Sequence, residues 1–204
     1  MRGPIVISGA VEGLLDEAIV RRLVEELGVT PGSVYGKYGK AFLREKIDAY
    51  NQAARFAPWV VIVDLDHDAD CAPPFRESWL PNPAQYMCFR VAVREIEAWL
   101  VADRNHLAKF LSVGASRIPQ DPEALDNPKR TMVDIAKFSR RRDIREDMVP
   151  QPDSGRKVGP AYTSRLIEFV RDPKRGWQPS VAAESSDSLN RCIRRLEQLI
   201  RGSK

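Results

Sequence analysis

The chain has 204 residues, of which 43% are hydrophobic and 29% charged, as in ordinary globular proteins. Its net charge of +4 permits a polyanionic partner without requiring one. The three cysteines are odd in number and lack a C-x-x-C pair, which argues against a disulfide framework or a zinc site. No apolar run approaches the roughly 20 residues that span a bilayer, and no signal peptide is evident. We therefore expect a cytoplasmic protein that does not enter a membrane.

The N-terminal segment predicts a strand followed by a helix. Pro4–Ala10 is short, apolar and rich in β-branched residues, which favours a buried strand. From Leu15 to Leu27 apolar residues recur at helical spacing, and Gly28 provides a C-cap. We expect a glycine-punctuated loop over 31–39, and then a second helix over 40–56.

Trp59–Val63 is the strongest predicted strand of the sequence. Its continuous apolar run is typical of a central parallel strand that is buried on both faces. The order strand, helix, helix, strand implies a right-handed crossover and a parallel sheet. A further strand is expected over Gln85–Val93, after a proline-rich loop at 73–83.

The remainder of the chain is predicted to be helical. We expect an α/β fold with a Rossmann-like parallel sheet over residues 1–112 and a mainly helical extension over 113–204, packed on the core or separate from it. The predicted helices lie at Arg94–Asp103, His106–Leu111, Thr131–Phe138, Tyr162–Val170 and Ser186–Arg201.

An acidic segment directly follows the central strand. Because side chains alternate along a strand, Asp64 and Asp66 are expected on the same side, roughly 7 Å apart. Carboxylates this close repel one another unless a cation lies between them. Asp68 adds negative charge without a neighbouring lysine or arginine in the sequence. Hard oxygen ligands suit Mg²⁺ or Mn²⁺, although the same pattern also fits a simple loop start and helix cap.

Glu12 occupies the corresponding position after the first strand. If the two strands are neighbours, its carboxylate reaches the same edge of the sheet as Asp64. Ligands of open α/β sheets bind at the carboxyl ends of the strands. The joint pattern predicts a divalent-metal site at this edge.

Val11–Glu17 together with Val60–Asp66 resembles a Toprim domain, over roughly residues 4–103. The resemblance implies that Glu12, Asp64 and Asp66 bind Mg²⁺ and that Glu12 also takes part in acid/base steps. Toprim domains occur in topoisomerases, primases, recombination proteins and nucleases of the overcoming-lysogenization-defect type. The chain lacks the tyrosine domain of a topoisomerase and the zinc ribbon of a primase.

A closer resemblance is to bacterial Toprim-like proteins that are often linked with genome-defence ATPases. Arg94–Leu100 resembles their E-x-W-L helix, which implies Glu97 as a further metal ligand, with Asp68. Glu95 lies about 200° away around such a helix and is expected to face elsewhere. Asn127–Lys129 resembles the lysine segment of Toprim nucleases, which implies a catalytic Lys129 that stabilises charge on a phosphate. Ordinary surface positions for Glu97 and Lys129 remain alternatives.

A basic segment is the candidate contact for nucleic acid. We expect phosphate contacts from Lys137, Arg140, Arg141 and Arg142, since a positive surface suits a phosphodiester. Asp143, Glu146 and Asp147 partly neutralise the segment, so a solvated helix face is the alternative.

Three functions are compatible with these patterns. The first is a Mg²⁺-dependent nuclease of Toprim type, as a phage-defence subunit. The second is a phosphatase, because Val63–Asp66 also resembles the nucleophile strand of haloacid-dehalogenase-type phosphatases. In that family, however, the nucleophile strand comes first. The third is a non-catalytic binding or regulatory subunit that docks on a separate ATPase.

Overall fold

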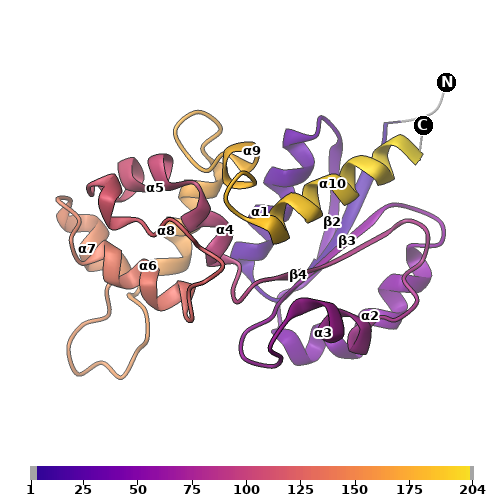
Figure 1. Ribbon diagram of the computed structural model, residues 1–204, viewed down its shortest axis with the longest axis horizontal. Coiled ribbons are helices and arrows are strands. Elements are labelled where there is room, and N and C mark those ends of the chain that lie inside the picture. Colours follow the sequence, from indigo (N-terminus) through magenta and orange to yellow (C-terminus); the bar gives the residue numbers. More distant parts are fainter. Residues whose placement is uncertain (1–3, 203–204) are drawn as a thin grey trace. The chain divides into compact units, whose positions relative to one another are not determined.

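A four-stranded parallel sheet carries the acidic segments (Figure 1). The computed structural model describes residues 4–202. The strand order is β2-β1-β3-β4, and helices flank the sheet, which confirms the predicted α/β class. The strands are β1 (Val6–Val11), β2 (Thr30–Gly36), β3 (Trp59–Asp64) and β4 (Met87–Ala92).

The second strand was not predicted from the sequence. Thr30–Gly36 falls largely within the expected loop 31–39, because proline and glycine usually interrupt strands. Here β2 is an edge strand that pairs only with β1 within the described residues, so Pro31 is tolerated. The predicted order strand, helix, helix, strand is therefore wrong, although the sheet is parallel as expected. The chain instead returns to the sheet between the two helices.

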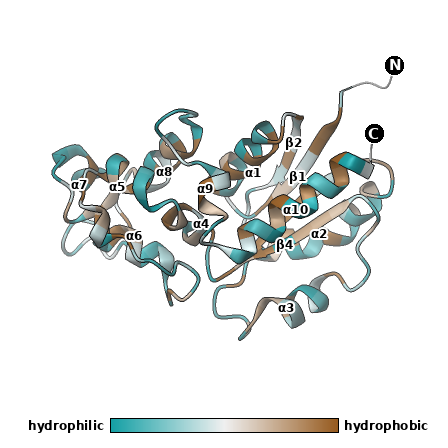
Figure 2. Cartoon of the chain, turned by 45° about the horizontal axis from the view of Figure 1, so that its top comes forward, coloured by the Kyte–Doolittle hydropathy of each residue, from teal (hydrophilic) through white to brown (hydrophobic). Residues whose placement is uncertain are grey.

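Helices cover both faces of the sheet, because its strands are apolar on both sides (Figure 2). Val61 and Val63 share one buried core with Leu43 of α2 and Phe75 of α3. On the opposite face, α1 packs closely on β1, where a Cβ on Gly9 would lie 3.2 Å from Val20 Cγ1. The helices of this unit are α1 (Leu14–Glu26), α2 (Lys40–Ala53), α3 (Ala72–Trp79) and α10 (Asp187–Gly202).

The chain forms two compact units, and the division differs from the predicted one at residue 112. The sheet unit runs to Val93 and also includes the residues from Ser188 on, whereas 94–187 form a helical unit. The last helix belongs to the sheet unit because Arg195 and Cys192 contact β4. The helical unit contains α4 (Glu97–Ala102), α5 (Arg104–Leu111), η1 (Ala115–Arg117), α6 (Pro128–Ala136), α7 (Arg142–Met148), α8 (Tyr162–Arg171) and α9 (Pro179–Ala182).

None of the helices within residues 4–202 combines the length and the apolar character needed to cross a membrane. The predicted strand at Gln85–Val93 is confirmed as β4, with slightly tighter bounds. The expected helix at Arg94–Asp103 begins later, at Glu97, which changes where the preceding acid lies.

Gly36 fixes the end of β2 against the end of β1. Its φ is +85°, and a Cβ there would lie 2.2 Å from the carbonyl oxygen of Val11. We expect Gly36→Ala to lower the free energy of unfolding by about 3 kcal/mol or more, since it combines backbone strain with a backbone clash.

Gly28→Ala is the matched control for urea unfolding. Its φ of +71° is similar, but nothing lies within 4 Å of the added Cβ. Gly28→Ala should therefore lower the free energy of unfolding by only about 1–2 kcal/mol, which is the strain of an alanine in the left-handed region. Equal losses in the two variants would contradict a structural role for the close contact between Gly36 and Val11.

Candidate functional site

Glu12 and Asp64 are in direct contact at the carboxyl end of the sheet. β1 and β3 are neighbours in the sheet and run parallel. Asp64 is the last residue of β3, and Glu12 follows the last residue of β1. The Asp64 backbone N–H donates to Glu12 Oε1 at 2.8 Å. The prediction that these two acids converge at one edge is therefore confirmed.

The carboxyl group of Glu12 is partly withdrawn from water. Desolvation raises its pKa, while the hydrogen bond from Asp64 and the charge of Lys40 act in the opposite direction. The charges of Asp66 and Asp68 add to the rise, and the net pKa lies above the ordinary glutamate value. Glu12 thus favours a bound proton or a nearby cation more strongly than an exposed glutamate does.

Lys40 supplies the cation that the acidic loop was predicted to lack. It is the first residue of α2, and its Nζ binds Asp66 and also Asp68 at 2.8 Å. Partial burial opposes its charge, but the hydrogen bonds with the two aspartates outweigh this effect, so its pKa is raised. Local sequence could not reveal the contact, because Lys40 and Asp66 are 26 positions apart.

The strand alternation that related Asp64 to Asp66 does not extend past Asp64. β3 ends at Asp64, and Asp66 has a positive φ of +47° within a turn. The Asp66 carboxylate therefore turns toward Lys40. The argument that placed both aspartates on the same side of one strand fails, although both belong to the same segment.

The Asp66 and Asp68 carboxylates both bind the ammonium group of Lys40. Across residues 4–202, no group of three or more His, Cys, Asp or Glu side chains is placed so that it could hold a metal ion. The donor set nevertheless has the hard oxygens that Mg²⁺ and Mn²⁺ prefer. A divalent ion at this edge would have to compete with Lys40 for Asp66 and Asp68.

A second cluster lies within the helical unit, around Lys129. The Lys129 backbone N–H donates to Glu95 Oε2 at 2.8 Å, and its Nζ lies 3.4 Å from Glu95 Oε1 and 3.6 Å from Glu97 Oε1. The expectation that Glu95 faces away from Glu97 is wrong. Glu95 precedes α4, so the helical angle between the two positions does not apply.

Glu97 is buried, which overturns the alternative of an ordinary surface acid. Its exposed fraction is 2%, and the Tyr162 hydroxyl donates to its Oε1 at 3.3 Å. Desolvation raises its pKa, and Lys129 only partly opposes that rise. Tyr162 was not singled out from the sequence, since nothing local links it to Glu97, 65 positions away. A metal shared by Glu97 with Asp68 stays a prediction.

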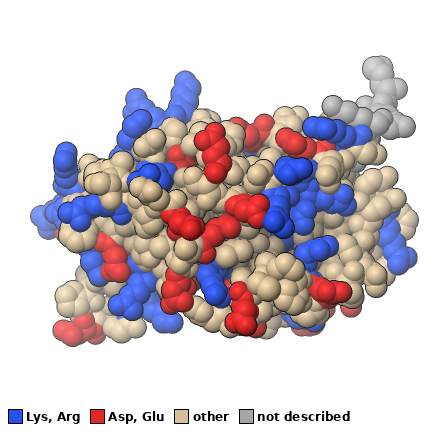
Figure 3. Space-filling view, in the orientation of Figure 1, with Lys and Arg blue, Asp and Glu red and all other residues tan. Residues whose placement is uncertain are grey.

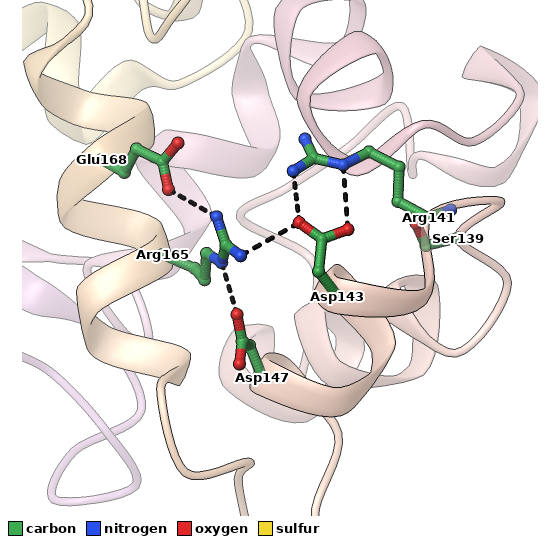
Figure 4. A network of polar contacts seen from close by, with 6 residues as sticks. All are labelled: Ser139, Arg141, Asp143, Asp147, Arg165 and Glu168. Atoms are coloured by element: carbon green, nitrogen blue, oxygen red, sulfur yellow. Dashed lines mark hydrogen bonds and ion pairs between the residues drawn. The ribbon is translucent and has the colours of Figure 1, made fainter.

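The predicted nucleic-acid segment is rich in compensated charges. Arg141 binds Asp143 at 3.1 Å, and Asp143 also accepts from Arg165 (Figure 4). The other pairs are Arg142 with Glu146 at 2.8 Å and Lys137 with Asp134 at 2.6 Å, while the backbone N–H of the exposed Arg140 donates to Ser112 O. Exposed pairs of this kind stabilise little but cancel charge. Phosphate contact by this segment stays a prediction.

Glu12→Gln tests the electrostatics of the candidate site. The amide oxygen keeps an acceptor for the Asp64 N–H. A raised folded pKa means that the wild-type protein loses stability as pH rises from the unfolded value of 4.5 through the folded pKa. We therefore expect the urea midpoint of Glu12→Gln to rise relative to wild type between pH 4 and pH 7.

Glu25→Gln, at an exposed position of α1, provides the control for loss of a carboxylate. The urea midpoint of Glu25→Gln should not rise relative to wild type between pH 4 and pH 7. A difference between Glu12→Gln and wild type that stays constant from pH 4 to pH 7 would contradict the raised pKa of Glu12.

The comparisons with known proteins give no match. No family model matches the chain, and neither a curated protein nor a solved structure does. The chemistry of the site is therefore argued from its own residues. The feature that carries the argument is the contact between Glu12 and Asp64.

Proposed function

We propose that the chain is a Mg²⁺- or Mn²⁺-dependent nuclease of Toprim type that hydrolyses phosphodiesters. The observation that carries the proposal is the contact of Glu12 with Asp64, two acids from neighbouring parallel strands. Ligands of open α/β sheets bind at this end of the strands. Asp66 and Asp68 extend the same carboxylate cluster.

The acidic residues would have two roles, metal binding and acid/base catalysis. Glu12 and Asp64 would hold the cation, together with Asp66 and Asp68. A bound divalent ion supplies positive charge at the phosphate and lowers the pKa of water. Glu12 would also take part in acid/base steps, as the resemblance to Toprim domains implies.

Lys40 would act as the counterion of the carboxylate cluster when no divalent ion is bound. Its ammonium offsets the repulsion between Asp66 and Asp68, and a divalent ion would compete for the same oxygens. Once displaced, the side chain would be available for a phosphate oxygen of the substrate. Under this proposal metal binding and release of Lys40 are coupled.

Removal of Lys40 should strengthen metal binding and lower the stability of the protein in the absence of a divalent ion. We expect Lys40→Gln to bind Mn²⁺ about 3- to 10-fold more tightly in calorimetry, because one competing charge is lost. Lys37→Gln is the matched control, since Lys37 pairs with Glu17 instead. Unchanged or weaker Mn²⁺ binding by Lys40→Gln would contradict the competition.

Cleavage of a labelled DNA or RNA strand with Mn²⁺ tests the proposed activity. Glu12→Gln and Asp64→Asn should each lower the rate by on the order of 10²–10⁴-fold, since each removes a carboxylate at the reacting phosphate. Asp70→Asn, at an exposed position of the same loop, should retain the wild-type rate. Circular dichroism would verify that the folds are intact.

Three outcomes would redirect the assignment. Undiminished cleavage by Asp64→Asn would refute the nuclease site. Turnover of a small phosphoester without nucleic-acid cleavage would favour a phosphatase. Absence of Mn²⁺ binding by the wild-type protein would favour a regulatory subunit, for which a separate ATPase is the proposed partner.

A further inference from the structure

Arginine side chains cover the free edge of β4. Within the described residues β4 pairs only with β3, at the end of the sheet opposite β2. Tyr86 O accepts from the N–H of Trp59 in β3, and Ala92 O accepts from the N–H of Leu65, the residue after β3. Because carbonyl directions alternate along a strand, the carbonyls of Met87 and Phe89 face away from β3. These outward carbonyls are the ones that arginines bind.

Two arginines hold these carbonyl groups. Arg195 of α10 donates from Nε and Nη2 to Met87 O, at 3.3 and 3.2 Å, and from Nη2 to Gln85 O at 2.9 Å. Arg90 of β4 donates from Nη1 to Phe89 O at 3.5 Å. A carbonyl accepts a hydrogen bond but carries no net charge, so both guanidinium groups keep their full positive charge.

Arg76 of α3 adds a third charge near the same strand. Burial raises the pKa of the Cys88 thiol, whereas the hydrogen bond with Cys192 and the charges of nearby arginines lower it, and the lowering is larger. The arginines that act on this thiol are Arg90, Arg195 and Arg76. These three arginines come from α3, β4 and α10 of the sheet unit, and we call them the β4 arginine cluster.

The charge of the β4 arginine cluster is not compensated by acids. Over residues 4–202, no ion pair joins Arg76, Arg90 or Arg195 to a carboxylate. Figure 3 shows basic side chains gathered over α10, and the exposed Arg194 lies on that helix. In contrast, Arg141 and Arg142 each pair with an acid.

We propose that the β4 arginine cluster binds the phosphate backbone of a nucleic acid. The inference rests on the proposed function for the identity of the polyanion. Arg195 and Arg90 bind different carbonyls between Gln85 and Phe89, so their guanidinium groups would contact different phosphates of one backbone. Contacts of this kind position the backbone and do not depend on base sequence.

The register of the sheet relates the cluster to the candidate site. Arg90 pairs with Ile62, and Ala92 pairs with Asp64. Arg90 therefore lies two residues, about 7 Å, before the position on β4 that faces Asp64. A backbone held along β4 would approach the carboxylate edge at the end of that strand.

Binding of a fluorescein-labelled 30-base-pair DNA duplex, measured by anisotropy in EDTA over a salt series, tests the surface. We expect Arg76→Gln with Arg90→Gln to weaken binding about 10-fold or more at low salt. The slope of log K against log salt should fall by roughly 2, since about 0.9 is lost per phosphate contact. Arg21→Gln with Lys46→Gln is the matched control, because each of these cations pairs with a glutamate, and it should bind as wild type does.

Arg76→Lys with Arg90→Lys separates charge from structure, because it should retain most of the salt slope. Thermal melting would identify a variant that fails to fold. No binding by the wild-type protein, or full binding by the glutamine variant, would overturn the inference. An equal loss in the lysine and glutamine variants would do so as well.

EDTA makes this test independent of the proposed metal chemistry. Full cleavage by Asp64→Asn, with DNA binding lost in the glutamine variant, would refute the metal site and retain the binding surface. Loss of cleavage in Asp64→Asn, with unchanged DNA binding by the glutamine variant, would refute the surface and retain the metal site.

Discussion

The parallel pairing of β1 with β3 is the constraint on which the candidate site depends. It places the end of one strand beside the end of the other, so that the Asp64 N–H reaches Glu12. The close approach requires a small residue in β1. A Cβ on Gly9 would lie 3.3 Å from Val60 O and 3.2 Å from a side-chain carbon of α1. A side chain at this position would press on β3 and on α1, which both lie closer than ordinary van der Waals contact.

At this edge the positive charge of Lys40 offsets the repulsion between the Asp66 and Asp68 carboxylates. A cation at the first position of a helix is unfavourable, by about 0.3–1 kcal/mol, because it faces the positive end of the helix dipole. Lys40 occupies that position in α2. Its ion pairs with Asp66 and Asp68 offset the cost. The lysine is therefore explained by the acids across the turn and not by the stability of its own helix.

Sequence patterns predicted the features that depend on local order. The apolar run of β3 and the acids at the two strand ends follow from residue type and spacing, and the structure confirms them. β2 was missed because an edge strand tolerates proline and glycine that otherwise indicate a loop. Lys40 was missed because its partner lies 26 positions away, and Glu95 was misplaced because α4 begins only at Glu97.

The ion pairs of the basic side chains differ from one part of the chain to another. Arg141 and Arg142 belong to one basic run and pair with Asp143 and Glu146, so acids offset their charge. Arginines that bind main-chain carbonyls satisfy their hydrogen bonds without losing charge. At β4 the same groups cover the free edge of a sheet, which otherwise invites pairing with another strand. Protection of the edge and the proposed attraction for phosphates would then arise from one arrangement.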